Sequence, residues 1–243
     1  MKIIWWAQTD PGKVRENNED SYLVDPSLDL FLLADGMGGH VGGKQASSIA
    51  VKAVKDYIFS NIENDKLSHE ELFSRALTEA NFKIYQAAID NPELKGMGTT
   101  FTGVWRRDNH LHFIHVGDSR LYRYRDGSMD QLTSDHTWVA EQLRAGYITP
   151  EEAKVSRFKS VITRSVGFEK TVRPDLEMIN CTPGDVYLMC SDGLSNYFQI
   201  EELERLIKYN FYSKIPEILL DTALRRGGED NITFILFYVA NED

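Results

Sequence analysis

The sequence predicts an α+β fold, in which helices and antiparallel strands form separate layers. Two helical stretches come first, a run of strands joined by tight turns follows, and strands and helices then complete the chain. A parallel α/β sheet would instead need strands and helices in regular alternation. The 243 residues are 42% hydrophobic and contain no Pro/Gly/Ser-rich linker or internal repeat, so we expect a single domain over residues 1–243.

The first half of the chain carries two amphipathic helices. After a short apolar strand at 31–34, apolar residues recur at helical spacing over 46–58. A second helix is predicted to start at Ser68, because Ser68 and Glu71 have the spacing of a capping box. An apolar stripe then continues over 72–87, which indicates a long helix with one buried face.

The middle and the end of the chain are rich in predicted strands. Polar turns at Asp108-Asn109 and Asp126-Gly127 separate β-prone runs, which is the pattern of an antiparallel meander. The expected strands cover residues 100–105, 111–116, 121–124, 186–190 and 232–237, and later helices are expected near 200–208 and 214–226.

Composition excludes several classes of protein. A net charge of −10 disfavours nucleic-acid binding, which depends on lysine and arginine. Cys181 and Cys190 are too few for a disulfide framework and fit a reducing compartment. The apolar start at 1–6 is too short for a signal peptide or a membrane span. We therefore expect a cytoplasmic monomer with no nucleic-acid or membrane partner.

Acidic residues lie next to the ends of several predicted strands. One Asp-Gly pair alone usually indicates a turn, but five acidic sites share this placement. They are Glu19-Asp20, Asp35-Gly36, Asp118, Asp192-Gly193 and Asp230. Gathered carboxylates repel one another unless cations neutralise them, and oxygen ligands favour Mg²⁺, Mn²⁺ or Ca²⁺. Two adjacent ions of this kind could activate a water for phosphoryl transfer.

The acidic residues belong to an ordered series of motifs that resembles the metal-dependent protein phosphatases, the type 2C or PPM family, in its bacterial form. The resemblance spans nearly the whole chain. It is carried by Arg15-Glu16-Asn17-Asn18-Glu19-Asp20, Asp35-Gly36-Met37-Gly38-Gly39-His40, Gly96-Met97-Gly98-Thr99-Thr100, Val116-Gly117-Asp118-Ser119-Arg120, Cys190-Ser191-Asp192-Gly193-Leu194 and Asp230-Asn231-Ile232-Thr233.

The resemblance implies a four-layer α-β-β-α sandwich, with two central antiparallel sheets flanked by helices and a metal cluster at one end. It also implies a serine/threonine protein phosphatase that hydrolyses phosphoserine and phosphothreonine by direct attack of a metal-activated water. The implied cofactors are two core Mn²⁺ or Mg²⁺ ions and a weaker third ion. Phosphorylated proteins, and a cognate Ser/Thr kinase circuit in signal transduction, are the implied partners.

The family motifs imply roles for individual residues. Asp35 would bridge the two core ions. The carbonyl of Gly36 and the Asp20 carboxylate would bind one of these ions, Asp192 and Asp230 the other, and Glu19 would act through a water. Asp118 resembles a ligand of the third ion, shared with Asp192. Arg15 would grip the phosphate oxygens with its planar fork of donors.

The sequence does not decide which group acts as the general acid that protonates the leaving alkoxide. Eukaryotic relatives carry a histidine directly after the Asp-Gly pair, whereas this chain has Met37. His40 lies close along the loop and is the candidate general acid. The alternative source of the proton is metal-bound water, in which case His40 would have a purely structural role in the loop.

Two other patterns suggest different chemistry. The segment 38–44 has the G-x-x-x-x-G-K spacing of a nucleotide-binding loop, but Gln45 replaces the hydroxyl residue that would bind Mg²⁺. His110, His112 and His115 resemble a metal cluster, but the first pair borders a polar turn and no recognised zinc pattern follows. We interpret the histidines as part of a hairpin surface.

A polar, helix-prone segment at about 137–163 resembles the flap that borders the active site in bacterial relatives. It would influence substrate choice and the third ion, and the alternative is an inert surface insertion. Two functions compete with the phosphatase: a catalytically silent regulator that binds phosphoproteins, and a hydrolase of small phosphate esters. The complete set of aspartates argues against the silent regulator. Only a substrate panel can distinguish the hydrolase of small phosphate esters from the protein phosphatase.

Overall fold

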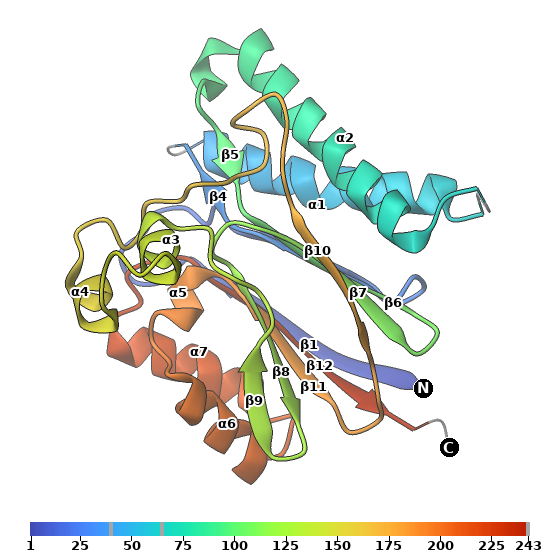
Figure 1. Ribbon diagram of the computed structural model, residues 1–243, viewed down its shortest axis with the longest axis vertical. Coiled ribbons are helices and arrows are strands. Elements are labelled where there is room, and N and C mark those ends of the chain that lie inside the picture. The colour runs from blue at the N-terminus through green and yellow to red at the C-terminus, as the bar shows by residue number, and fades with distance from the viewer. Residues whose placement is uncertain (39–40, 64–65, 242–243) are drawn as a thin grey trace.

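The computed structural model describes residues 1–38, 41–63 and 66–241, and two five-stranded antiparallel sheets form its centre (Figure 1). In sheet A the order is β1 (Lys2–Asp10), β12 (Ile232–Ala240), β11 (Val186–Cys190), β8 (Arg120–Arg125) and β9 (Ser128–Gln131). In sheet B it is β10 (Asp175–Asn180), β7 (His110–Val116), β6 (Phe101–Arg107), β3 (Leu30–Ala34) and β2 (Ser21–Asp25).

Helices cover the outer face of each sheet. Helices α1 (Gly42–Asn61) and α2 (His69–Asp90) pack against sheet B, and α6 (Ile200–Tyr209) and α7 (Ile215–Arg226) pack against sheet A (Figure 1). Shorter elements are β4 (Gly36–Met37), β5 (Gly98–Thr99), the 3₁₀ turn Pro92–Leu94, α3 (Trp138–Arg144), α4 (Pro150–Val155) and α5 (Asp192–Ser195). The predicted four-layer α-β-β-α sandwich is confirmed.

Three apolar clusters hold the layers together, one between the sheets and one under each helical layer. Between the sheets, the rings of Phe31 and Phe237 stack with centroids 4.5 Å apart, and Tyr187 stacks on Phe237 at 4.9 Å. These rings come from β3, β12 and β11, so they lock sheet B onto sheet A. The strand ends that carry the acidic residues are thereby held in fixed relation.

Local signals explain the helix ends. Ser68 Oγ accepts a hydrogen bond from Glu71 N–H, and Glu71 Oε2 accepts one from Ser68 N–H, both at 3.1 Å. The capping box predicted for α2 is therefore confirmed. Helix α1 extends beyond the predicted 46–58 at both ends, and a Cβ on Gly43 in its first turn would lie 2.0 Å from Glu19 Oε2.

The expected strand ranges cover the inner strands of both sheets but not the four edge strands β1, β9, β10 and β2. Strand β1 pairs with β12 along its whole length, from Lys2 opposite Ala240 to Asp10 opposite Ile232. Strand β10 pairs with β7 and contains no buried residue, so it lacks a continuous apolar run. No helix in the described part of the chain is both long and apolar enough to cross a membrane.

Candidate metal centre

Acidic residues from both sheets meet at one end of the sandwich. Asp35 directly follows β3, Asp118 comes shortly after β7, Asp192 comes shortly after β11, and Asp230 precedes β12. Together with Glu19, Gly36 and Arg15 they line a cavity of about 430 Å³, which we call the acidic cavity. Asp20 is buried nearby, close enough to raise the pKa of Asp35. The structure thus brings together the carboxylates singled out in the sequence.

Close backbone contacts explain why two of these aspartates are followed by glycine. A Cβ on Gly36 would lie 2.1 Å from the carbonyl oxygen of Gly43 in α1. A Cβ on Gly193 would lie 2.0 Å from the carbonyl oxygen of Asn231. Any other residue at either position would push the neighbouring segment away, so each glycine lets a chain segment approach the acidic cavity closely.

The carboxylates raise one another's pKa values. Burial and the charges of Asp20, Asp192, Asp118 and Asp230 hold the pKa of Asp35 well above its ordinary value. Burial, together with the charge of Asp192, raises the pKa of Asp20 to about 7 and that of Asp118 to about 7. The pKa of Asp192 is also raised, by burial and by the charge of Asp230. Such a cluster is at its most stable when positive charge is added.

The donor set fits a hard divalent cation. Every candidate side chain is a carboxylate, and the buried Oδ1 atom of Asp20 has no hydrogen-bond partner. Within residues 1–38, 41–63 and 66–241, no three His, Cys, Asp or Glu side chains could hold an ion by themselves. Mg²⁺ typically takes one or two carboxylates and keeps several waters, so this arrangement suits ions that stay partly hydrated.

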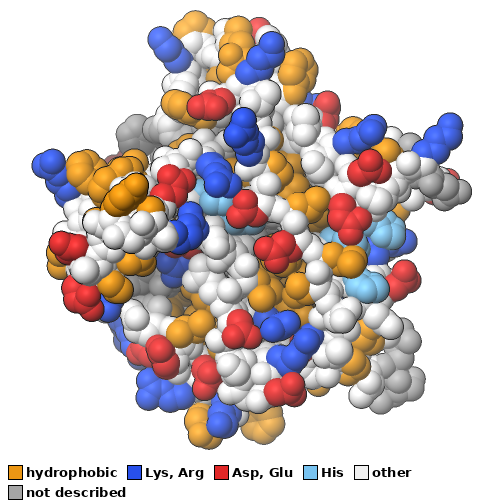
Figure 2. Space-filling model, viewed as in Figure 1, with side chains coloured by type: hydrophobic (Ala, Val, Ile, Leu, Met, Phe, Trp, Pro, Cys, Tyr) orange, Lys and Arg blue, Asp and Glu red, His pale blue; other side chains and the backbone are white. Residues whose placement is uncertain are grey.

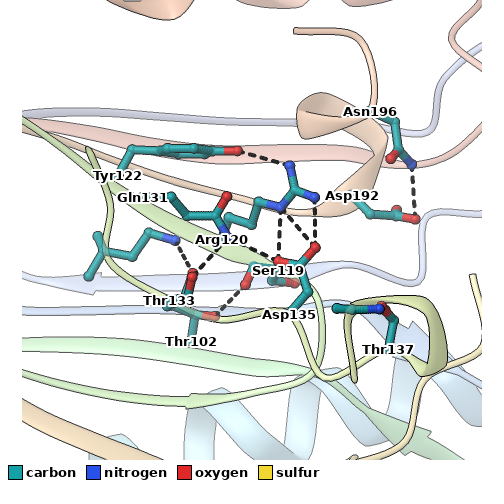
Figure 3. Close-up of polar contacts among 12 residues, drawn as sticks. Thr102, Ser119, Arg120, Tyr122, Gln131, Thr133, Asp135, Thr137, Asp192 and Asn196 are labelled. Carbon is teal, nitrogen blue, oxygen red and sulfur yellow. Dashed lines mark hydrogen bonds and ion pairs between the residues drawn. The ribbon is translucent and has the colours of Figure 1, made fainter. Parts of the chain in front are cut away.

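Arg15 is the basic residue at the acidic cavity. Its Nη2 donates a hydrogen bond to Asp230 Oδ2 at 2.8 Å, while more than half of the side chain is exposed. The charge of Asp230 raises the pKa of the guanidinium. Arg120 lies on the other side of Asp192, where its Nη2 donates to Asp135 at 2.7 Å (Figure 3). Its charge is therefore already balanced by Asp135.

Several residues that hold the carboxylates in place had no role assigned from the sequence. The Asn231 amide donates to the carbonyls of Pro11 and Asn17, and its oxygen accepts from the Glu19 N–H. Asn231 therefore fixes the N-terminal segment against the start of β12. The signal was available, because Asn231 directly follows Asp230 in its motif.

Two further side chains contact the aspartates directly. Ser191 Oγ donates to Asp20 Oδ2 at 2.8 Å. Asn196 Nδ2 donates to Asp192 Oδ2 at 3.2 Å, as Figure 3 shows. Asn196 lies one helical turn after Asp192, a spacing that places both side chains on the same face of α5. The sequence therefore contained the signal for Asn196 but not for Ser191, whose partner is 171 residues away.

The candidate general acid, His40, lies outside the described residues. Met37 lines the acidic cavity, as expected for the residue after the Asp-Gly pair. Ser160 and Ile162, at the end of the predicted flap, line it as well. The two ends of the predicted flap are hydrogen-bonded to each other: Trp138 N donates to Val161 O, and Thr163 N donates to His136 O, each at 2.8 Å.

The histidine interpretation was wrong in one respect. His112 and His115 are almost fully buried rather than on a hairpin surface, because β7 is an inner strand of sheet B. The His112 ring packs beside His69 of α2, whereas the His115 ring packs beside His136 on the other face of the strand. His115 Nδ1 lies 3.0 Å from Thr102 Oγ1. Burial, with the neighbouring His136, lowers the pKa of His115 to about 4.

Comparison with known proteins places these features in a family. Residues 13–224 match the family model described as Protein phosphatase 2C. The chain is 38% identical over 246 residues to "Serine/threonine protein phosphatase PstP" of Mycobacterium tuberculosis, covering 100% of this chain but 46% of PstP. It thus spans about half the length of that relative. It is 37% identical to "Protein phosphatase PhpP" of Streptococcus pneumoniae, covering 97% of both chains.

Solved structures of phosphatases have the same fold as this chain. The crystal structure of the Mycobacterium tuberculosis phosphatase PstP/Ppp superposes with a TM-score of 0.89 at 35% identity, covering 99% of this chain and 100% of that one. The catalytic domain of PstP "in complex with 2 Manganese ions" superposes with a TM-score of 0.86 at 35% identity, covering 98% and 99%.

Proposed function

The chain belongs to the protein phosphatase 2C family, the metal-dependent serine/threonine protein phosphatases, and we propose that it hydrolyses phosphoserine and phosphothreonine in proteins. The observation that carries this proposal is the acidic cavity, where carboxylates from both sheets surround one space of about 430 Å³. A cluster of this kind needs cations, and cations held by carboxylates suit phosphoryl transfer.

We assign the cation ligands residue by residue. Asp35 would bridge two core ions, with Gly36 O and Asp20 on one and Asp192 and Asp230 on the other. Glu19 would act through a water, and Asp118 with Asp192 would hold a weaker third ion. The mutual rise of the pKa values of Asp20, Asp35, Asp118 and Asp192 supports this assignment. The ions would be Mn²⁺ or Mg²⁺.

The bound ions would lower the pKa of a water and neutralise charge on the phosphoryl group, so that water attacks phosphorus directly. The protein's own groups orient the substrate. Arg15 would hold two phosphate oxygens through its fork of N–H donors. Its present partner is Asp230, and Arg15 would be available for phosphate if Asp230 held a cation. This couples substrate binding to cation binding.

The proton for the leaving alkoxide would come from His40 or from water. Met37 carries no proton to donate, so it leaves this role to another group. A His40→Gln variant separates the two sources. If His40 is the general acid, the variant should have a lower kcat for substrates with a poor leaving group, such as phosphothreonine, and a nearly unchanged kcat for p-nitrophenyl phosphate.

The remaining assignments are proposals as well. We propose one catalytic domain over residues 1–243 with a flap at about 137–163, acting as a cytoplasmic monomer in signal transduction opposite a Ser/Thr kinase. The substrates would be phosphorylated proteins, with no nucleic-acid or membrane partner.

A substrate panel tests the function against its alternatives. With Mn²⁺ present, we expect release of phosphate from a phosphothreonine peptide and from p-nitrophenyl phosphate, and none from a phosphodiester. Binding of the peptide without release would identify a silent phosphoprotein-binding regulator. Release from small esters but not from the peptide would identify a small-molecule hydrolase.

A further inference from the structure

A second cavity, of about 540 Å³, lies beside the acidic cavity. Met37 and Ile162 line both, so the two cavities adjoin. We propose that this flanking cavity, which also contains Arg164, Phe168, Glu169 and Arg173, binds an anionic group of the substrate protein a few residues from the phosphorylated one. The anionic group would be a carboxylate side chain or a second phosphate. This proposal rests on the proposed phosphatase function.

Charge is the first argument. The flanking cavity carries two arginines against one glutamate, in a chain whose net charge is −10. Arg173 is exposed, and it forms no hydrogen bond or ion pair with any described residue. Arg164 is already engaged, because its Nη1 donates to Asp175 Oδ1 at 3.0 Å. Arg173 is therefore the cation with a free guanidinium beside the site of chemistry.

The second argument is that the wall of the flanking cavity is preformed. Val166 exchanges two backbone hydrogen bonds with Thr99, at 3.0 and 2.8 Å. The buried Asn81 side chain of α2 accepts from Gly167 N–H at 2.7 Å and donates to the carbonyls of Glu169 and Lys170 at 3.1 Å. This segment is thus pinned to β5 and α2, so a substrate would not have to order it on binding.

The third argument concerns shape and position. The segment that leaves the flap crosses over β4 and β5 before it turns down into β10 (Figure 1). Figure 2 shows basic side chains, with acidic ones among them, on the part of the surface over which this segment runs. Phe168 exposes 57% of its surface and offers an apolar contact for the methylenes of a glutamate. An extended peptide advances about 3.3–3.6 Å per residue, so residues near the phosphorylated one reach an adjoining cavity.

The test compares phosphothreonine peptides that differ at one flanking position, which carries Asp, phosphoserine, Ala or Lys. Phosphate release by the natural chain with Mn²⁺ should be most efficient for the anionic peptides and least for Lys, mainly through KM. High salt should reduce the difference, because the pairing is solvent-exposed. If the natural chain releases phosphate from all four peptides equally well, the proposal is wrong while the phosphatase function stands. No release from any peptide contradicts the function itself.

Two variants assign the preference to the cavity. Arg173→Gln should lower the ratio of kcat/KM for the Asp peptide over the Ala peptide about three- to five-fold, the size expected for an exposed ion pair. Glu169→Gln should raise the same ratio. A rise of this kind cannot be caused by misfolding, so it supports a direct effect of charge in the flanking cavity. Arg75→Gln makes the same charge change on the exposed side of α2, outside both cavities, and should leave the ratio unchanged. Equal ratios in Arg173→Gln and Arg75→Gln would overturn the proposal.

Discussion

Arg15 and Asp230 form an ion pair at the acidic cavity, with 2.8 Å between Nη2 and Oδ2. One partner is the proposed phosphate ligand and the other is a proposed cation ligand. Each therefore neutralises the other as the structure stands. A cation on Asp230 and a phosphate beside Arg15 would replace this pair together, which predicts that the two bind cooperatively.

Replacing Arg15 should weaken catalysis without unfolding the protein. Arg15→Gln removes a charge-assisted contact to phosphate, which is worth about 1.5–3 kcal/mol and so about 10- to 100-fold in kcat/KM. The control is Arg225→Gln, which breaks the exposed pair with Asp221 on α7. Steady-state phosphate release from a phosphothreonine peptide measures both. Equal activity of the two variants would count against Arg15 as the phosphate ligand.

Mn²⁺ should stabilise the protein against heat, because it relieves repulsion within the acidic cavity. At a concentration 100 times Kd, the expected gain is about 2.7 kcal/mol, or about 5–11 °C in Tm for a chain of this size. Asp192→Asn should reduce the gain. Without metal, Asp192→Asn should melt no lower than the natural chain, because one repelling charge is gone. A Tm that Mn²⁺ does not change in the natural chain would contradict the cluster.

Asn231 should matter for cation binding although it is not a proposed ligand. Asn231→Ala leaves the carbonyls of Pro11 and Asn17 and the N–H of Glu19 without their partner. Unpaired polar groups of this kind cost about 1–3 kcal/mol. We expect a lower Tm together with a weaker Mn²⁺ affinity, measured by titration calorimetry. If Asn231→Ala lowers the Tm but binds Mn²⁺ as tightly as the natural chain, Asn231 has a structural role only.

The pair of buried Asp185 and partly exposed Arg125 should give a pH-dependent part of the stability. Burial alone would raise the pKa of Asp185, but hydrogen bonds from Arg125, Thr182 and Tyr187 outweigh it and lower the pKa. Because the folded pKa lies below the unfolded one, this stability is present above about pH 4 and is lost as the pH falls through the folded value.

Asp185→Asn should therefore lower the free energy of unfolding at pH 7 by about 1.5–3 kcal/mol, the size of a hydrogen bond to a charged group, because it takes away the charged partner of the partly exposed Arg125. Urea unfolding at pH 7 and at pH 3 measures the difference. The gap between variant and natural chain should narrow at the lower pH. A gap that stays constant would show that ionisation of Asp185 is not its source.

The acidic cavity could be predicted from the sequence because its signals are local. Each aspartate stands beside an apolar strand, and Gly36 and Gly193 mark the close contacts that follow. The antiparallel arrangement could be read from turns such as Asp126-Gly127, where Asp126 adopts a positive φ of 51°. These local signals place each aspartate near a strand end, whereas their meeting in one cavity depends on the packing of the two sheets.

The features that were missed depend on long-range pairing. Strand β1 is stable only because β12, more than 220 residues later, lies beside it. The burial of His112 follows from α2 packing over β7, which no property of the histidine itself reveals. The contact of Ser191 with Asp20 likewise joins segments that only the folded sandwich brings together.

The most direct test of the central claim is phosphate release from a phosphothreonine peptide, with and without Mn²⁺, by the natural chain and by Asp192→Asn. We predict release by the natural chain that requires Mn²⁺ and is lost in Asp192→Asn, while both proteins remain folded by circular dichroism. Equal release with and without metal, or full activity of Asp192→Asn, would contradict the claim that cations held by these carboxylates carry out the hydrolysis.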